Sequence, residues 1–329
     1  MSFRVNDTPV TAAAGATPAS LFQIGSNTKA FTSVLLLRLE ADGKVRLDDR
    51  IGRWLPQYAA WKNVTIHSLL DMTSGIPTYD NDPVFQRKYA ADPYHNYSAA
   101  ELVGAVYPKN GRAQFLKGWN YSNTGYILTQ MVIERVTGQR YADVLRTRII
   151  QPLGLSQTYY AAHKLPAPQH QRLVSGYFFN NDPDNKGLAP LYNTDVKPYS
   201  LSWTQAAGGI VATPSDVTRW ARVLYEGSIL PPQQRKELMS LVSNKTGQPI
   251  AATGAADPKG FGLGVAQAVM PKLGRIWYYE GETLGYRVLH AWLPASDTIV
   301  TVALNSQPRA EDDKIGDLMT RIIAVLPPR

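Results

Sequence analysis

The hydrophobic pattern of this 329-residue chain changes period along its length, and this change limits the folds that it can adopt. Residues 48–202 carry mostly the three- and four-residue spacing of helices, interrupted by loops rich in Pro, Asn, Asp and Tyr. The last third carries short runs rich in Val, Ile, Trp and Tyr, which favour strands, with turn residues between them. The pattern therefore predicts a mostly helical lobe together with an antiparallel sheet.

The predicted elements can be placed by residue number. Helices are expected over residues 29–40, 65–72, 98–106, 124–137, 141–150, 214–224 and 312–325. Strands are expected over residues 206–212, 261–270, 275–279, 286–293 and 298–304, with hairpin turns at Pro271-Lys272 and at residues 294–297. The last helix should pack on the sheet, and the sequence contains no internal repeat.

The composition indicates a globular protein with a large core. With 44% hydrophobic and 18% charged residues, the chain is expected to form two closely packed domains. Its net charge is +8, but the 34 Lys and Arg residues are mostly scattered singly, which favours a solvated basic surface over a nucleic-acid site. The chain has no cysteine, which excludes disulfides, thiolate catalysis and cysteine metal ligands.

The sequence shows neither a membrane span nor a targeting segment. Its longest apolar run, residues 322–326, is far shorter than the ~20 residues that cross a bilayer. Residues 1–20 lack the basic start and apolar stretch of a signal peptide, so none is predicted in the chain as given. These observations leave the compartment open.

The histidines form no metal-binding motif. None of the five lies in a close ligand pair, and each is expected to be structural or on the surface: His67, His95, His163, His170 and His290. The chain also lacks a dinucleotide-binding loop and a Gly-x-Ser-x-Gly turn. We therefore expect no metal site and no cofactor.

Ser26-Asn27-Thr28-Lys29 stands where a short apolar stretch meets the helix predicted over residues 29–40. Residues three apart share one face at a helix start, so the Lys29 ammonium can reach the Ser26 hydroxyl. A serine nucleophile needs a base, and burial can lower the pKa of a lysine enough to provide one. The helix start also directs the Ser26 backbone N–H toward a developing oxyanion. This motif alone is equally compatible with a capping serine followed by a surface lysine.

A second candidate motif, Tyr121-Ser122-Asn123, stands just before the helix predicted over residues 124–137. Tyr121 can shuttle a proton between nucleophile and leaving group, and the Asn123 amide can orient the substrate and hold Lys29. Taken alone, however, Tyr-Ser-Asn is more typical of a capping turn.

In this order and spacing, the two motifs resemble those of the serine β-lactamase and penicillin-binding protein superfamily, in its class C β-lactamase, D,D-peptidase and esterase branch. Residues 40–49, 66–77, 207–218 and 261–263 are also similar to that branch, so the resemblance covers nearly the whole chain.

This resemblance implies an α+β fold of the β-lactamase/D,D-peptidase type, with an antiparallel sheet flanked by helices plus a mostly helical lobe. Residues 1–50 and 203–329 would form the sheet-containing domain, residues 51–202 would form the lobe, and the site would lie between them. Relatives that act on peptidoglycan are usually exported, which favours a periplasmic or secreted protein.

The resemblance also implies a third motif, Lys-Thr-Gly or His-x-Gly, on a strand that lines the site. The literal string Lys245-Thr246-Gly247 follows a helical pattern and precedes a stretch without a strand pattern, so we expect it in a flexible loop remote from the site. Tyr279-Glu280-Gly281, at a predicted strand end, matches the motif's context better. The backbone N–H of Glu282 would then join that of Ser26 in an oxyanion hole.

The third motif departs from the family pattern in charge. Tyr279 replaces the usual Lys or His, which keeps a hydroxyl donor but removes a cation. Glu280 stands where relatives often use a hydroxyl to bind a substrate carboxylate, and a carboxylate there repels another. Arg287 or Asn305 could restore anion binding.

The front of the chain also departs from the family. Only 25 residues precede Ser26, whereas the usual first helix and first strand would need roughly twice that number. We therefore expect the edge of the sheet to be incomplete, or the chain to be shortened at its front.

Together the motifs predict a serine hydrolase that forms an acyl-enzyme on an amide, ester or lactam of a small-molecule or peptide substrate. D-Alanyl carboxypeptidase, D-amino-acid peptidase, esterase and β-lactamase activities all fit. The alternative is a penicillin-binding sensor or a degenerate scaffold without turnover. The sequence does not define an oligomeric state.

Overall fold

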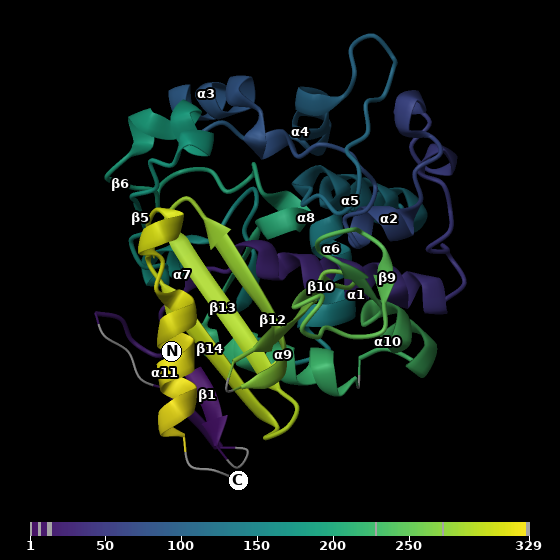
Figure 1. Cartoon of the computed structure of the whole chain (residues 1–329). Coiled ribbons are helices and arrows are strands. Elements are labelled where there is room, and N and C mark those ends of the chain that lie inside the picture. Colours follow the sequence, from purple (N-terminus) through teal and green to yellow (C-terminus); the bar gives the residue numbers. More distant parts are fainter. Residues whose placement is uncertain (1, 6–7, 12–14, 228, 272, 327–329) are drawn as a thin grey trace.

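The computed structural model describes residues 2–5, 8–11, 15–227, 229–271 and 273–326, so Lys272 of the predicted hairpin lies outside the described residues. Among the described strands, nine form one antiparallel sheet in the order β2-β1-β14-β13-β12-β11-β10-β8-β9. Helices pack on this sheet, and most of the remaining helices gather to one side of it (Figure 1). The predicted α+β fold with an antiparallel sheet is confirmed.

The strands of this sheet are short apart from the central ones. They are β1 (Ser2–Val5), β2 (Thr8–Thr11), β8 (Leu241–Ser243), β9 (Pro249–Ile250), β10 (Lys259–Phe261), β11 (Ala266–Met270), β12 (Gly274–Thr283), β13 (Tyr286–Leu293) and β14 (Thr298–Leu304).

Two predicted strands have the wrong extent. Residues 261–270 are not one strand, because a turn in which Gly262 N–H donates to the Val265 carbonyl separates β10 from β11. Conversely, the strand predicted over residues 275–279 continues as β12 to Thr283, because pairing with β13 persists to the Thr283–Tyr286 pair. Tyr279-Glu280-Gly281 therefore lies inside a strand instead of at its end.

The sheet has a different helix on each face. On one face, α11 (Ile315–Val325) buries Ile315, Met319 and Ile322 against β13 and β14, as expected for a helix with apolar residues at this spacing. On the other face, α9 (Pro214–Glu226) packs on β13 and β14, and its Trp220 stacks at 3.8 Å on Phe31 of α1 (Thr28–Ala41). This places the buried helix α1 in the centre of the molecule.

The edge of the sheet beyond β14 is not bare. β1 pairs with β14 and β2 pairs with β1, so the expectation of an incomplete edge was wrong. The reason is that the residues before Ser26, although few, supply two paired strands, β1 and β2.

The lobe contains more elements than the pattern predicted. Its helices are α2 (Ile66–Leu70), α3 (Pro83–Ala91), α4 (Ala99–Val106), α5 (Asn123–Thr137), α6 (Tyr141–Leu145) and α7 (Ala167–Arg172). The helix expected over residues 141–150 ends as α-helix at Leu145 and continues as a π-helical turn to Ile150. Helix α3, capped by Asp82, was not predicted because its short run lacks a strong apolar stripe.

A small three-stranded sheet connects the lobe to the nucleophile segment. It consists of β3 (Phe22–Gln23), β7 (Ile210–Ala212) and β4 (Thr158–Tyr160). The strand predicted over residues 206–212 is thus only partly correct, because Gln205–Gly208 forms the short helix α8, whose Ala206 N–H donates to the Gln130 side chain. Among the described residues, no helix is long and apolar enough to span a membrane.

Candidate active site

Ser26 lies in a 3₁₀ turn, Gly25–Asn27, that leads directly into α1. Gly25 has a φ of +52°, and a Cβ atom there would lie 2.5 Å from the backbone oxygen of Glu282. Only glycine fits this left-handed position against strand β12. The turn therefore presents Ser26 beside the strand that carries Tyr279-Glu280-Gly281.

Lys29, in the first turn of α1, is completely buried and points at Ser26. Its Nζ lies 3.0 Å from Ser26 Oγ, 2.5 Å from Asn123 Oδ1 and 2.9 Å from the Ala207 carbonyl oxygen. Burial lowers the pKa of Lys29 to about 7, against an opposing effect of the Asp80 charge. A substantial fraction of Lys29 is then neutral near pH 7 and can accept a proton.

Tyr121 also reaches the nucleophile. Its hydroxyl lies 2.5 Å from Ser26 Oγ, and the Lys29 ammonium lies 4.7 Å from the centre of its ring. The residue is 37% exposed, yet the protein groups around its hydroxyl desolvate it and raise the pKa of Tyr121. Tyr121 is therefore a hydroxyl that can pass a proton on, whereas the neutral amine of Lys29 is the better base.

Asn123 begins α5 and connects Lys29 to a residue that sequence reasoning missed. The Asn123 Nδ2 donates to Asp80 Oδ2 at 2.8 Å, so its Oδ1 is left to accept from Lys29. Asp80 belongs to the 3₁₀ turn Tyr79–Asn81 and also accepts from the Thr78 hydroxyl. No motif marks Asp80 in the sequence, because its role depends on a contact with a residue 43 positions away.

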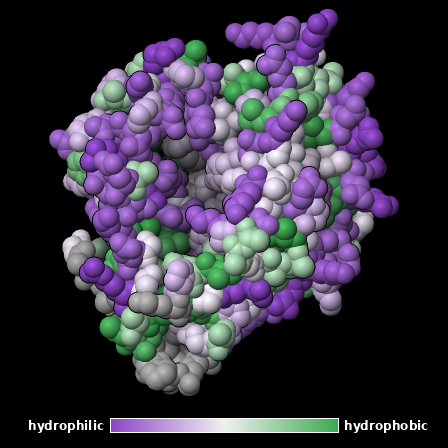
Figure 2. All heavy atoms as spheres, viewed as in Figure 1, coloured by the Kyte–Doolittle hydropathy of each residue, from purple (hydrophilic) through white to green (hydrophobic). Residues whose placement is uncertain are grey.

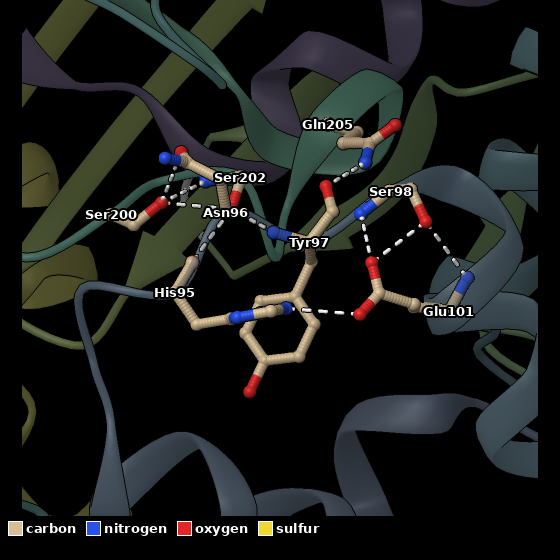
Figure 3. Close-up of polar contacts among 8 residues, drawn as sticks. All are labelled: His95, Asn96, Tyr97, Ser98, Glu101, Ser200, Ser202 and Gln205. Atoms are coloured by element: carbon tan, nitrogen blue, oxygen red, sulfur yellow. Dashed lines mark hydrogen bonds and ion pairs between the residues drawn. The ribbon is translucent and has the colours of Figure 1, made fainter.

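The Ala207 carbonyl that accepts from Lys29 is held by a polar network around Gln205. The Gln205 side chain donates to the Tyr97 carbonyl and accepts from the Gln130 side chain, both at 2.8 Å. Gln205 also has a φ of +34°, an unfavourable conformation for a residue with a side chain. Figure 3 shows Gln205 above Tyr97, where Ser202 also bonds the 95–97 segment. These hydrogen bonds tie α8 to Tyr97 and Gln130 and so hold the Ala207 carbonyl in place.

Strand β12 passes directly behind the nucleophile turn. A Cβ atom on Gly281 would lie 2.0 Å from the Ile24 carbonyl oxygen, so the strand and the turn are in backbone contact. The buried Tyr279 hydroxyl has no hydrogen-bond partner among the described residues. It lies near the Tyr121 hydroxyl, and it lowers the pKa of Tyr121 by less than burial raises it. The structure thus brings Tyr279 and Gly281 to the nucleophile.

A cavity of about 390 Å³ opens in front of Ser26, and Figure 2 shows a hollow in this face of the molecule. Its lining includes Ser26, Tyr121 and Asn123, aromatic walls, and charged groups; the charged members are Asp80, Glu280, Glu282 and Arg287. The cavity lies between α3, α5, α8 and the end of β12.

Glu280 lines the cavity and pairs with Arg287. The buried Arg287 guanidinium pairs with Glu280, with Glu282 at 3.3 Å and with Asp313 at 2.5 Å. Three carboxylates thus surround one cation, and Asp80 adds a further negative charge to the cavity. The cavity wall is acidic overall, which favours a cationic substrate group over an anionic one.

One candidate, Asn305, and the rejected string Lys245-Thr246-Gly247 both lie outside the cavity lining. Asn305 is exposed, and its amide donates to the Ser175 carbonyl at 2.8 Å, so it offers no anion-binding donor to the cavity. Lys245-Thr246-Gly247 also lies outside the cavity lining, but its predicted surroundings were wrong. It forms the turn between β8 and β9, and Gly247 packs on the backbone of Gly118.

No cluster of three or more possible metal ligands occurs among the described side chains. Three of the five histidines have separate environments: His67 pairs with Asp71, His95 pairs with Glu101, and His290 is buried in the core.

The fold and this arrangement of Ser26, Lys29 and Tyr121 are accompanied by a family match over nearly the whole chain. Residues 3–324 match the Beta-lactamase family, so the chain belongs to it. The resemblance stated from the motifs is therefore confirmed.

Individual relatives are distant. The chain is 28% identical to penicillin-binding protein 4* of Bacillus subtilis over 274 residues, which are 82% of this chain and 57% of that protein. It thus spans little more than half of that curated relative. A D-stereospecific amidohydrolase from Streptomyces sp. superimposes with a TM-score of 0.79 at 27% identity, covering 92% and 88% of the two chains. D-amino acid amidase from Ochrobactrum anthropi SV3, complexed with D-phenylalanine, does so with a TM-score of 0.74 at 25% identity and 95% coverage of both.

Proposed function

We propose that this chain is a serine hydrolase that transfers the acyl group of an amide or ester to Ser26 and then to water. The observation that carries the proposal is the buried Lys29, whose Nζ lies 3.0 Å from Ser26 Oγ and whose pKa is lowered to about 7. Burial disfavours the charged ammonium of Lys29 and so favours the neutral amine, which is the form that a general base requires.

The acylation step uses the side chains of Ser26, Lys29 and Tyr121 and two backbone N–H groups. Neutral Lys29 accepts the Ser26 proton as Oγ bonds to the substrate carbonyl carbon, and the backbone N–H groups of Ser26 and Glu282 receive the negative oxygen. The Tyr121 hydroxyl gives its proton to the leaving nitrogen or oxygen and takes in its place the proton that Lys29 accepted from Ser26. The carbonyl bond to the leaving group breaks, and Lys29 is restored once that proton has been passed on.

Deacylation repeats these steps with water as the nucleophile. The water gives one proton to neutral Lys29 through the Tyr121 hydroxyl as its oxygen attacks the acyl carbon, and Lys29 returns that proton to the departing Ser26 Oγ. Asn123 holds Lys29 through both steps, because its amide is fixed on the other side by Asp80.

For the substrate, we propose an acyl group that carries a free ammonium, as in an amide or ester of a D-amino acid. The acidic wall formed by Asp80, Glu280 and Glu282, only partly balanced by Arg287, supports this choice. The names of two similar structures, a D-stereospecific amidohydrolase and a D-amino acid amidase, support it independently. Substrates with a carboxylate beside the scissile bond, including penicillins, should be disfavoured.

An activity panel tests both parts of the proposal. Purified protein is offered D- and L-phenylalanine amide, a chromogenic ester, a D-alanyl-D-alanine peptide and a fluorescent penicillin, with Ser26→Ala as the control. Repeated turnover of the D-amide, absent in Ser26→Ala, is expected. A single stable penicillin adduct without turnover would support the alternative of a penicillin sensor, and no reaction at all would support a scaffold.

A further inference from the structure

His290 is a completely buried histidine on β13, and it lies directly behind the nucleophile turn. Its Nδ1 is 2.7 Å from Asn27 Oδ1, and its Nε2 is 2.8 Å from the Tyr225 hydroxyl of α9. Asn27 is the residue next to Ser26. The serine hydrolase mechanism above uses none of these three side chains.

The hydrogen bonds of Asn27 determine which ring nitrogen of His290 carries the proton. Asn27 Nδ2 donates at 2.8 Å to both the Ile24 and Val288 carbonyls, so its Oδ1 can only accept. His290 Nδ1 must therefore donate, and Nε2 of the neutral ring accepts from the Tyr225 hydroxyl. Every polar atom of the His290 ring and of the Asn27 amide then has a matched partner.

The surroundings of His290 keep the ring neutral. On the neighbouring strands it stands opposite Tyr279 of β12 and Thr301 of β14, and the groups that contact its nitrogens are the uncharged Asn27 and Tyr225. Burial lowers the pKa of His290 to about 3, so the Nδ1–H donor is present at any working pH.

This chain of bonds acts on the geometry of the nucleophile. Asn27 joins the turn that bears Ser26 to the backbone of β13, and His290 fixes the plane of that amide. The bond to the Val288 carbonyl sets the distance between the turn and the sheet, and the bond to the Ile24 carbonyl closes the turn on itself. Together they determine the position of the Ser26 Oγ and N–H relative to the Glu282 N–H. A small displacement of reacting groups is enough to slow catalysis by orders of magnitude.

We propose that His290 is a positioning residue for Ser26, acting through Asn27 by a hydrogen bond from Nδ1–H. The proposal rests on the proposed function, because it concerns the rate at which Ser26 is acylated. It assigns the ring no proton transfer to substrate.

Two substitutions of His290 distinguish the hydrogen bond made by Nδ1 from the one made by Nε2. In His290→Asn, the amide nitrogen occupies the place of Nδ1 and can still donate to Asn27, while Tyr225 loses its acceptor. In His290→Gln, the longer side chain brings an oxygen to the place of Nε2, so that Tyr225 keeps its acceptor while Asn27 loses its donor. Each variant leaves one buried polar group without a partner, so the two should lose similar thermal stability.

The measurements are the melting temperature, kcat and KM on a chromogenic ester, and the rate at which a fluorescent phosphonate labels Ser26. The proposal expects kcat and the labelling rate of His290→Gln to fall by on the order of 10- to 100-fold, with KM little changed. Those of His290→Asn should stay within about threefold of wild type. Tyr225→Phe is the further control, because it lowers stability without touching Asn27.

The proposal would be overturned if His290→Gln and His290→Asn both fold and have equal kcat and labelling rates. It would also be overturned if the loss of rate in these two variants and in Tyr225→Phe merely followed the loss of melting temperature. If His290→Gln fails to fold, Asn27→Leu replaces it and should show the same loss of kcat; if His290→Asn fails to fold, Tyr225→Phe replaces it as the variant that keeps its rate. A wild type that neither turns over nor takes up the phosphonate would overturn the proposed function and this inference with it. An active wild type with equal variants overturns the inference alone.

Discussion

Lys29 Nζ and Asn123 Oδ1 lie 2.5 Å apart, and this contact joins the first turns of the two central helices, α1 and α5. Because the Asn123 Nδ2 is committed to Asp80, the amide holds Lys29 in place without placing a charge against it. The Asp80 charge raises the pKa of Lys29, but burial lowers it and is the stronger influence.

The rate of acylation should consequently depend on pH through Lys29. Since its pKa in the folded protein is about 7, the neutral amine that accepts the Ser26 proton is lost as the pH falls below that value. We expect kcat/KM on an uncharged ester to rise with pH and to level off above pH 7. A profile of kcat/KM between pH 5 and 9 checks this, and a rate that is flat across this window would contradict a lysine base.

Asp80→Asn should shift that profile toward lower pH. The Asp80 charge raises the pKa of Lys29, so its removal favours the neutral amine, while the amide oxygen of the new side chain can still accept from Asn123. The pH midpoint of the variant, measured on the same ester, should lie below that of wild type. A midpoint that moves upward or stays in place would show that Asp80 does not act on the group that titrates.

Lys29→Ala should cripple acylation, because a methyl side chain cannot accept a proton. It also leaves two acceptors, Asn123 Oδ1 and the Ala207 carbonyl, without their donor. Lys29→Met loses the same donor but fills more of the lysine's volume, so it is the matched second variant. Single-turnover kinetics on a chromogenic ester measure the effect. If a folded variant kept a rate within about tenfold of wild type, a loss of only ~1.4 kcal/mol, Tyr121 would have to be the sole base.

The sequence predicted the parts of this molecule that depend on neighbours along the chain. The helix beginning at Asn123 and the strands over residues 286–293 and 298–304 follow local periodicity, and they agree with the structure to within a residue. Ser26 and Lys29 were paired correctly because three residues separate them within one turn of a helix.

The sequence could not predict contacts between distant segments. Asp80 approaches Asn123 only because the 3₁₀ turn Tyr79–Asn81 packs on α5. The place of the Ala207 carbonyl depends on the strained Gln205. The orientation of Glu280 also remained open, since neighbouring strand residues alternate faces and only the register of β12 on β13 brings Arg287 to it.

Lys245→Ala should leave the steady-state rates nearly unchanged. Lys245 lies outside the cavity lining, and its ammonium donates at 2.5 Å to the Ala256 carbonyl on the surface. The turn itself contacts Gly118, so the backbone should be left intact and only the side chain shortened. Kinetics on the preferred substrate test this, and a large loss in a folded variant would mean that Lys245-Thr246-Gly247 is the third motif after all.

Glu280→Thr should change the preference of the cavity for the charge of its substrate. Removing this carboxylate relieves repulsion of a substrate carboxylate and also frees part of the Arg287 guanidinium to attract one. Activity on carboxylate-bearing substrates, such as D-alanyl-D-alanine peptides, should rise by about tenfold relative to neutral ones, for ~1.4 kcal/mol of relieved repulsion. The measurement is kcat/KM for a matched pair of substrates, one a free acid and the other its methyl ester.

Asp313→Asn is the control for Glu280→Thr, because Asp313 pairs with the same Arg287 but does not line the cavity. If the effect of Glu280 arises from its place in the cavity wall, Asp313→Asn should change the acid-to-ester ratio much less. If Arg287 alone governs the ratio, both variants should raise it together, because each releases one ion pair of the guanidinium. An acid-to-ester ratio that Glu280→Thr leaves unchanged would mean that Arg287 already cancels the charge of Glu280, and it would return carboxypeptidase activity to first place among the substrate classes.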